Sequence, residues 1–255
     1  MARYDDTEIG GHRVHFATTH WTLLEQVRGP LSPAHQEVLN LLIAQYWKPV
    51  YCFIRRQYPR YDKETAKDVT QSFFVHCLTE ELFGRADRKK GRFRNLLLQS
   101  LKNYLANYER GQHAQKRAPV GQIMSIDALM EEEDMNFEPA VEGSAEAAFD
   151  REFTLNQIKK VLDLVRTDFL SKGQQVHWEI FRRQIVNPIL QDTQAPGLDA
   201  LAREFGLSRK QVSNRLITTR RAFQRLFREY VGSTACSEED VAAEVDTLSR
   251  FVAGS

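Results

Sequence analysis

The sequence predicts an all-α protein in which two helical domains are joined by a flexible acidic linker. Apolar residues recur every three or four positions through most of the 255 residues, which is the spacing of amphipathic helices. Residues 118–150 interrupt this pattern, because they are rich in Glu and contain no Lys or Arg, a composition typical of linkers. We therefore predict a loose leader (1–17), a first domain (18–117), a linker (118–148), a second domain (149–232) and an amphipathic tail (233–255).

Three main helices are predicted in the first domain. The helical pattern begins at Pro33, and Pro49 predicts a kink or a restart within it because proline lacks the N–H of a helix interior. Asp62 is the predicted N-cap of the next helix. The third helix spans residues 93–110 and follows a basic loop at 85–92.

The third helix and its preceding loop indicate a nucleic-acid surface. Phe93, Leu101 and Tyr104 share the apolar side, whereas amide and basic residues share the other. A cationic loop beside amide and aromatic groups suits single-stranded DNA, whose bases can stack or enter pockets. The alternative is an ordinary amphipathic helix with its aromatic residues in the core. The predicted contacts to single-stranded DNA are Arg88, Lys89, Lys90, Arg92, Arg94, Asn95, Lys102 and Asn103.

A second signal for DNA binding lies in residues 198–216, with the sequence LDALAREFGLSRKQVSNRL. The apolar spacing fits two short helices packed on each other, with Gly206 in the tight turn between them. Ser208 follows as the predicted N-cap of the second helix. This is the layout of a helix-turn-helix, whose second helix lies in the major groove of duplex DNA.

The outward residues of that second helix have the chemistry that duplex DNA requires. Arg and Lys bind guanine or phosphate, and Gln and Asn bind adenine. Glu204 is the only acid between Arg203 and Arg228, whereas a solvated helix surface normally mixes both charges. The alternative is a three-helix domain whose charged side is merely solvated. The predicted contacts to duplex DNA are Ser208, Arg209, Lys210, Gln211, Ser213, Asn214, Arg215 and Arg220.

Composition limits the other classes of function. No apolar run could span a bilayer and the first residues lack the apolar core of a signal peptide, so we expect a cytoplasmic protein without a membrane partner. Cys52 and Cys77 are expected to be buried apolar residues. His12, His15 and His20 have no neighbouring Cys for a standard zinc site, and we expect neither metal nor cofactor. The sequence has no Gly-rich phosphate loop, zinc-protease pair, nucleophile elbow or CxxC pair, which argues against an enzyme.

In their order and spacing these motifs resemble the extracytoplasmic-function group of bacterial RNA polymerase sigma factors. The first domain resembles sigma region 2 in residues 44–51 (AQYWKPVY), 65–74 (TAKDVTQSFF) and 93–103 (FRNLLLQSLKN). The second domain resembles sigma region 4 in residues 201–208 (LAREFGLS) and 212–216 (VSNRL). Residues 19–23 (THWTL) and the tail from 238 resemble a subgroup common in planctomycete-type bacteria. Two positions depart from the family pattern: the usual Trp is Leu96, and the usual small apolar residue is Ser100.

The resemblance implies a transcription initiation factor that is not a catalyst. Such a factor binds core RNA polymerase, recognises an upstream promoter element as duplex through region 4, and captures flipped bases of the downstream element through region 2. It also implies that Asp68 and Gln71 face the polymerase clamp, and that the acidic linker runs near the RNA exit path. An anti-sigma protein is a partner that the resemblance leaves open.

Two other classes of function fit the sequence less well. A stand-alone helix-turn-helix regulator would explain residues 198–228, but it would leave the basic loop and the helix at 93–110 without a role. A DNA-processing enzyme would need a cluster of carboxylates or histidines, which the sequence pattern does not contain.

Overall fold

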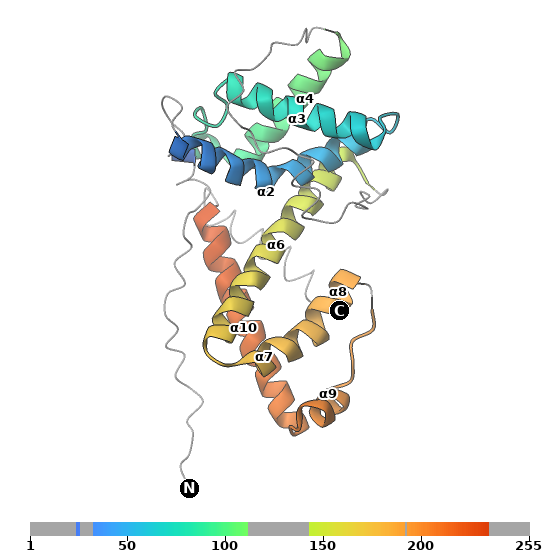
Figure 1. The fold of residues 1–255 in the computed structure, drawn as a ribbon, viewed down its shortest axis with the longest axis vertical. Helices are drawn as coiled ribbons and strands as arrows, with labels where there is room; N and C mark the ends of the chain where they lie inside the picture. Colours follow the sequence, from blue (N-terminus) through green and yellow to red (C-terminus); the bar gives the residue numbers. More distant parts are fainter. Residues whose placement is uncertain (1–23, 26–32, 112–142, 192, 235–255) are drawn as a thin grey trace. The chain divides into compact units, whose positions relative to one another are not determined.

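The computed structural model describes residues 24–25, 33–111, 143–191 and 193–234, and within these ranges the only regular elements are helices (Figure 1). The predicted all-α fold is therefore confirmed for this part of the chain. The predicted leader with His12 and His15, the neighbouring His20, residues 118–142 of the predicted linker and residues 235–255 of the predicted tail lie outside the described residues. The elements are α2 (Pro33–Gln57), α3 (Lys63–Thr79), the 3-10 helix η1 (Arg88–Lys90), α4 (Phe93–Glu109), α6 (Ala145–Ser171), α7 (Gln175–Phe181), the π-helix η2 (Arg182–Val186), α8 (Asn187–Gln191), α9 (Leu198–Phe205) and α10 (Arg209–Thr234).

The helices group into two compact units, and α6 contributes residues to both. Among the described residues, the first unit contains those up to Lys160 together with 231–234, and the second contains those from Val161 to Tyr230. The predicted start of the second domain at residue 149 falls inside α6. Residues 145–160 group instead with the first unit, because Phe149 and Phe153 are buried in its hydrophobic core.

Aromatic packing joins α2, α4 and α6 in the first unit. The Tyr46 ring meets the Phe93 ring edge-on at 5.3 Å between centroids, and it stacks on Phe153 at 5.6 Å. All three side chains are buried. Aromatic pairs in these geometries contribute about 0.5–1.5 kcal/mol beyond the area they bury, so this contact helps to fix three helices at one point.

The ends of the helices in the first unit follow mostly from local signals. Asp62 is the N-cap of α3, as predicted, and its carboxylate accepts a hydrogen bond from the Thr65 N–H at 2.8 Å. The predicted restart at Pro49 does not occur, since α2 runs through this residue to Gln57. Glu109 at the end of α4 accepts hydrogen bonds from Arg60 and Tyr61 in the loop between α2 and α3.

Two cysteines belong to this core. Cys52 and Cys77 are buried free thiols, which confirms that they serve as small apolar residues. Burial raises the pKa of both thiols well above the ordinary value, so neither has the thiolate character that reactive cysteines need.

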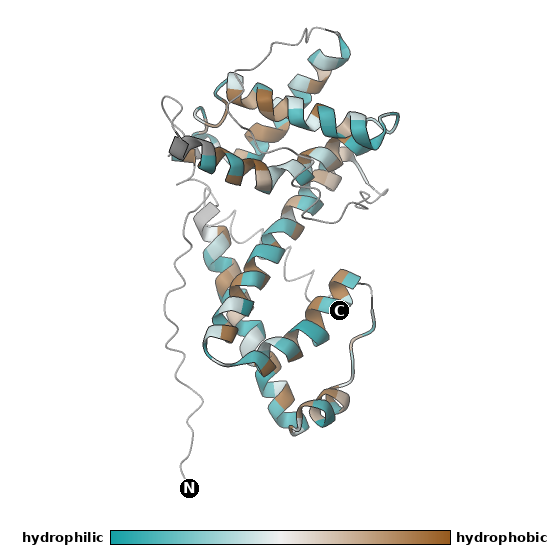
Figure 2. Cartoon of the chain, viewed as in Figure 1, coloured by the Kyte–Doolittle hydropathy of each residue, from teal (hydrophilic) through white to brown (hydrophobic). Residues whose placement is uncertain are grey.

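The second unit is a helical cluster in which α7 supports the two helices of the predicted DNA-binding motif. Ile180 of α7 packs against Leu201 of α9 and Val212 of α10. Further along α10, Phe223 lies 5.8 Å from Phe181, measured between ring centroids. Figure 2 shows that hydrophilic and apolar residues alternate along α10, as expected for a helix with one buried side.

The segment between α7 and α8 has a wider helical turn. The N–H of Asn187 donates to the carbonyl of Arg182, five residues earlier, and this bond marks the π-helix η2. Such π-turns insert one extra residue into a helix. The insertion shifts the side chains that follow relative to those of α7.

The turn between α9 and α10 matches the sequence prediction. Gly206 has the left-handed backbone conformation (φ +65°), and the N–H of Leu207 donates to the carbonyl of Ala202 at 2.8 Å. Ser208 accepts a hydrogen bond from the Gln211 N–H at 3.2 Å, and Gln211 Oε1 accepts one from the Ser208 N–H at 2.8 Å. The predicted N-cap is thus confirmed as one half of a reciprocal capping pair.

We predict that Gly206→Ala lowers the free energy of unfolding by about 1–2 kcal/mol, the cost of a left-handed conformation for a residue with a Cβ. A Cβ at this position would meet no atom within 4 Å, so the loss reflects the backbone conformation alone. Urea unfolding followed by circular dichroism measures the effect. Gly206→Asn is the control and should lose less, because Asn adopts this conformation more readily. Equal stability of Gly206→Ala and the wild type would contradict the prediction.

Candidate nucleic-acid interface

The exposed side of α10 brings together several of the residues predicted to bind duplex DNA. Val212, Thr219 and Phe223 are buried and define the inward side of the helix. Exposed on the remaining sides is the α10 surface, which we define by its residues Arg209, Lys210, Gln211, Asn214, Ile217 and Arg221. Ser208 is exposed at the cap, and Ser213 is half-buried at the edge of this surface.

Arg215 is not part of the α10 surface. At 3.6 residues per turn it points about 140° away from Lys210 around the helix. Its side chain is half-buried, and its Nε is buried without a hydrogen-bond partner among the described residues. Arg220 is also half-buried, and its Nε is in the same condition. The sequence prediction grouped these two arginines with the other DNA contacts because of their charge. The helical period separates Arg215 from the α10 surface.

Positive charge on the α10 surface is only weakly compensated. Arg209 forms a pair with Asp199 at 3.4 Å, with both side chains 68% exposed, and such exposed pairs contribute little. Lys210 and Arg221 form no ion pair within the described ranges. The cations of this surface can therefore bind phosphates or guanines, and few ion pairs within the protein have to break first.

Gln211 is exposed on the α10 surface and also caps the start of the helix. Its Oε1 caps the Ser208 N–H, so the acceptor atom of the amide is already engaged. Its side-chain nitrogen keeps two N–H donors. Asn214, one turn later, is exposed on the same surface.

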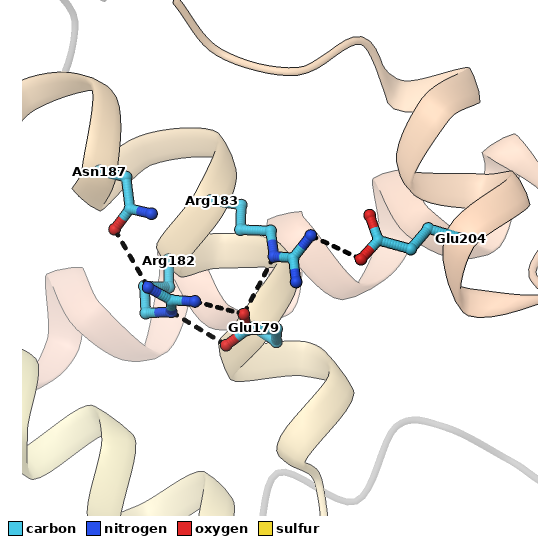
Figure 3. A network of polar contacts seen from close by, with 5 residues as sticks. All are labelled: Glu179, Arg182, Arg183, Asn187 and Glu204. Carbon is cyan, nitrogen blue, oxygen red and sulfur yellow. Dashed lines mark hydrogen bonds and ion pairs between the residues drawn. The ribbon is translucent and has the colours of Figure 1, made fainter. Parts of the chain in front are cut away.

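A network of ion pairs connects the end of α7 and η2 to α9 (Figure 3). Arg182 donates to both carboxylate oxygens of Glu179, at 2.5 and 2.9 Å. Arg183 donates to Glu179 at 3.0 Å and to Glu204 of α9 at 2.6 Å. The Arg183 guanidinium also lies 5.6 Å from the centre of the Phe205 ring. Glu204, the one acid in the otherwise basic stretch, is thus paired away from α10.

These arginines shift the ionisation of Glu179. Hydrogen bonds from Arg182, and more weakly from Arg183, lower the pKa of Glu179 to about 2 from the ordinary 4.5. The sequence pattern did not predict this network. The spacing of Glu179 with Arg182 (i,i+3) and Arg183 (i,i+4) is a local signal that could have indicated the first two pairs.

On α4, the predicted residues differ in whether they contact α6. Asn95 and Asn103 are exposed, and Gln99 between them donates a hydrogen bond to Asn103 Oδ1 at 3.1 Å. Spaced four residues apart, these three amides form one row, which we call the α4 amide row. The apolar residues predicted to point inward, among them Phe93, Leu101 and Tyr104, are buried as expected.

Arg94 and Lys102 lie on the side of α4 that faces α6. Lys102 forms an ion pair with Glu146 at 2.8 Å, and the Arg94 guanidinium lies 5.3 Å from the centre of the Phe153 ring. The hydrogen bond from Lys102 also lowers the pKa of Glu146. Neither α6 partner could be identified from the sequence pattern of the α4 helix.

The basic loop precedes the α4 amide row directly. Asp87 caps η1 by accepting a hydrogen bond from the Lys89 N–H at 3.0 Å. Lys89 and Lys90 are exposed, Arg92 is half-buried, and the Arg88 side chain lies outside the described residues. Gly91 has φ +115°, a conformation that glycine adopts readily, and it leads the chain from η1 into α4.

The two residues expected to face a protein partner lie on one side of α3. Asp68 is exposed and Gln71, three residues later, is half-buried. No helix of the described residues is long and apolar enough to cross a membrane. Within the same residues, no group of three or more His, Cys, Asp or Glu side chains could hold a metal ion.

We predict that Glu179→Gln destabilises the protein at pH 7 and that this loss shrinks as the pH falls. A carboxyl group whose pKa is lower in the folded than in the unfolded state stabilises the fold above the unfolded value of about 4.5, and this stabilisation is lost as the pH falls toward about 2. Thermal unfolding of both proteins between pH 7 and pH 3 measures the gap.

Glu229→Gln is the matched control, because it removes one partner of an exposed i,i+4 ion pair with Arg225 in the same unit. Such a pair contributes only about 0.3–0.5 kcal/mol. A gap between Glu179→Gln and the wild type that stays constant from pH 7 to pH 3 would contradict the prediction.

Comparison of the chain with models of known protein families, with curated proteins and with solved structures finds no match. The chemistry and geometry of the α10 surface, the α4 amide row and the basic loop are therefore the grounds for a proposal about function.

Proposed function

We propose that this protein is a bacterial transcription initiation factor that binds core RNA polymerase, recognises promoter DNA and assists its melting. The observation that carries the proposal is the presence of two surfaces with different DNA chemistry in one chain. The α10 surface is cationic and follows a capped turn, whereas the α4 amide row is uncharged and adjoins a basic loop. A factor that works with bacterial RNA polymerase acts in the cytoplasm.

The α10 surface suits duplex DNA. A helix that begins at a tight turn, is supported by two others and exposes cations and amides has the requirements for docking in a major groove. Lys210 and Asn214 offer a cation and an amide one turn apart, toward base edges or phosphates. Arg221 extends the positive charge along the helix.

The α4 amide row suits unpaired bases. Amide side chains can both donate to and accept from the exposed edges of flipped bases. Because they are uncharged, they are not attracted to phosphates as Lys and Arg are. Lys89 and Lys90 are exposed in the adjoining loop, where they can follow the strand that connects those bases. We assign Arg94 and Lys102 a different role, which is to hold α6 against α4.

The polymerase contact is assigned to α3. Exposed Asp68 and half-buried Gln71 offer a carboxylate and an amide on one side of the helix. An anti-sigma protein could compete for this side. We infer no chemical step for the protein, and no cofactor enters the proposal.

The second candidate is a stand-alone helix-turn-helix regulator that binds duplex DNA without polymerase. It accounts for the α10 surface, but it gives no role to the α4 amide row or the basic loop. Run-off transcription with purified core RNA polymerase and a library of promoters separates the two. Initiation that depends on the protein supports the proposal. Specific binding to duplex DNA without any initiation, on every template tested, would favour the regulator.

We predict that Asn103→Ala severely reduces open-complex formation on duplex promoters but is largely rescued when the downstream element is already mismatched. Capture of flipped bases offsets part of the free-energy cost of unstacking, a few kcal/mol per base. On a mismatched template the bases are already unpaired, so little of this cost has to be offset. Arg209→Ala and Lys210→Ala are the controls, because they act on intact duplex and the same mismatch should not rescue them. If Asn103→Ala is equally defective on both templates, the melting role of α4 is wrong.

We also predict that the basic loop and Lys102 differ in the salt dependence of binding. Lys89→Ala and Lys90→Ala should each reduce the slope of log K against log salt on a mismatched template by about 0.7, the value for one phosphate contact to a single strand. Lys102→Ala should leave the slope nearly unchanged, because Lys102 already pairs with Glu146. A reduction by Lys102→Ala as large as that of the loop variants would contradict the assignment.

A further inference from the structure

The α10 surface contains one apolar residue that its charge and amide chemistry do not explain. Ile217 is 44% exposed, and it is the one large apolar side chain of α10 that is exposed among the described residues. The other apolar residues of this helix, such as Val212 and Phe223, point inward and are buried. Ile217 therefore makes no contribution to the packing of α10 comparable with theirs.

Ile217 lies at the centre of the α10 surface. Seven residues after Lys210, it is rotated from it by only about 20° and displaced by about 10 Å along the helix axis. Asn214 precedes it by three residues and Arg221 follows it by four, so both are its neighbours on the same side. An apolar group is thus surrounded by two cations and an amide, each with the chemistry of DNA contact.

In the major groove the base edges present hydrogen-bonding groups and one apolar substituent, the C5-methyl group of thymine. Lys210, Asn214 and Arg221 supply partners for the hydrogen-bonding groups and phosphates, whereas Ile217 can supply none. We propose that Ile217 is a specificity-determining residue that contacts the C5-methyl group of a thymine in the upstream promoter element. This inference rests on the proposed role of the α10 surface in duplex binding.

Isolated apolar residues also occur on protein surfaces without a binding role. Leu190 on α8 is such a residue in the same unit, and at 45% its exposure is nearly equal to that of Ile217. It lies outside the α10 surface and serves as the matched control. Truncation of either side chain to Ala removes little buried area, so both variants should fold.

The test removes the methyl group from the DNA and the side chain from the protein. Core RNA polymerase carrying the full chain is first used to select preferred sequences from duplex promoters with a randomised upstream element. Each thymine of the selected element is then replaced by deoxyuridine, which lacks only the C5-methyl group. Binding of every template is measured with the wild type, Ile217→Ala, Leu190→Ala and Lys210→Ala.

We expect one deoxyuridine replacement to weaken wild-type binding about fourfold, the factor that corresponds to burial of one methyl-sized group. Leu190→Ala should retain this fourfold effect, whereas Ile217→Ala should bind the thymine and deoxyuridine templates equally. The inference is overturned if no replacement weakens wild-type binding, or if Ile217→Ala keeps the full sensitivity. If no upstream element is selected, or if Lys210→Ala binds it as tightly as the wild type, the proposed function itself fails.

Discussion

The first unit depends on the burial of Phe153 from α6 against Tyr46 of α2, whose ring also contacts Phe93 of α4. Because this contact anchors α6, it decides which side of α4 is covered. Arg94 and Lys102 lie on the covered side and find partners in α6, whereas the α4 amide row stays exposed. The polar surface that we assign to unpaired bases is thus defined by an apolar contact.

In the second unit, a smaller set of buried apolar residues likewise fixes the helices and leaves a polar surface exposed. The helices α9 and α10 bury a small core, and α7 completes it through Ile180. Arg183 adds a polar connection between the end of α7 and Glu204 of α9. Because Glu204 is engaged there, the α10 surface keeps its excess of positive charge. The same pairs that orient the supporting helices therefore shape the electrostatics of the exposed one.

Local signals in the sequence were sufficient for much of the fold, and long-range partners were not. The caps at Asp62 and Ser208 and the turn at Gly206 depend on residues within one or two turns, so the sequence predicted them correctly. The periodicity of Phe149 and Phe153 predicted helix, but periodicity does not reveal which domain buries a helix. In the same way, a basic composition could not show that Lys102 has an acidic partner more than 40 residues later.

The cap formed by Gln211 limits the chemistry available at that position. A glutamine pairs with adenine through two bonds, one of which needs the amide oxygen as acceptor for the amino group of the base. In this protein that oxygen already accepts the Ser208 N–H, which occupies one of its two lone pairs and fixes its direction, whereas both side-chain N–H donors remain for another partner. Such N–H donors can bond the acceptors that guanine, adenine and thymine present in the major groove, whereas cytosine presents only a donor there. The cap that stabilises the start of α10 would thus favour the three bases with major-groove acceptors over cytosine at this position.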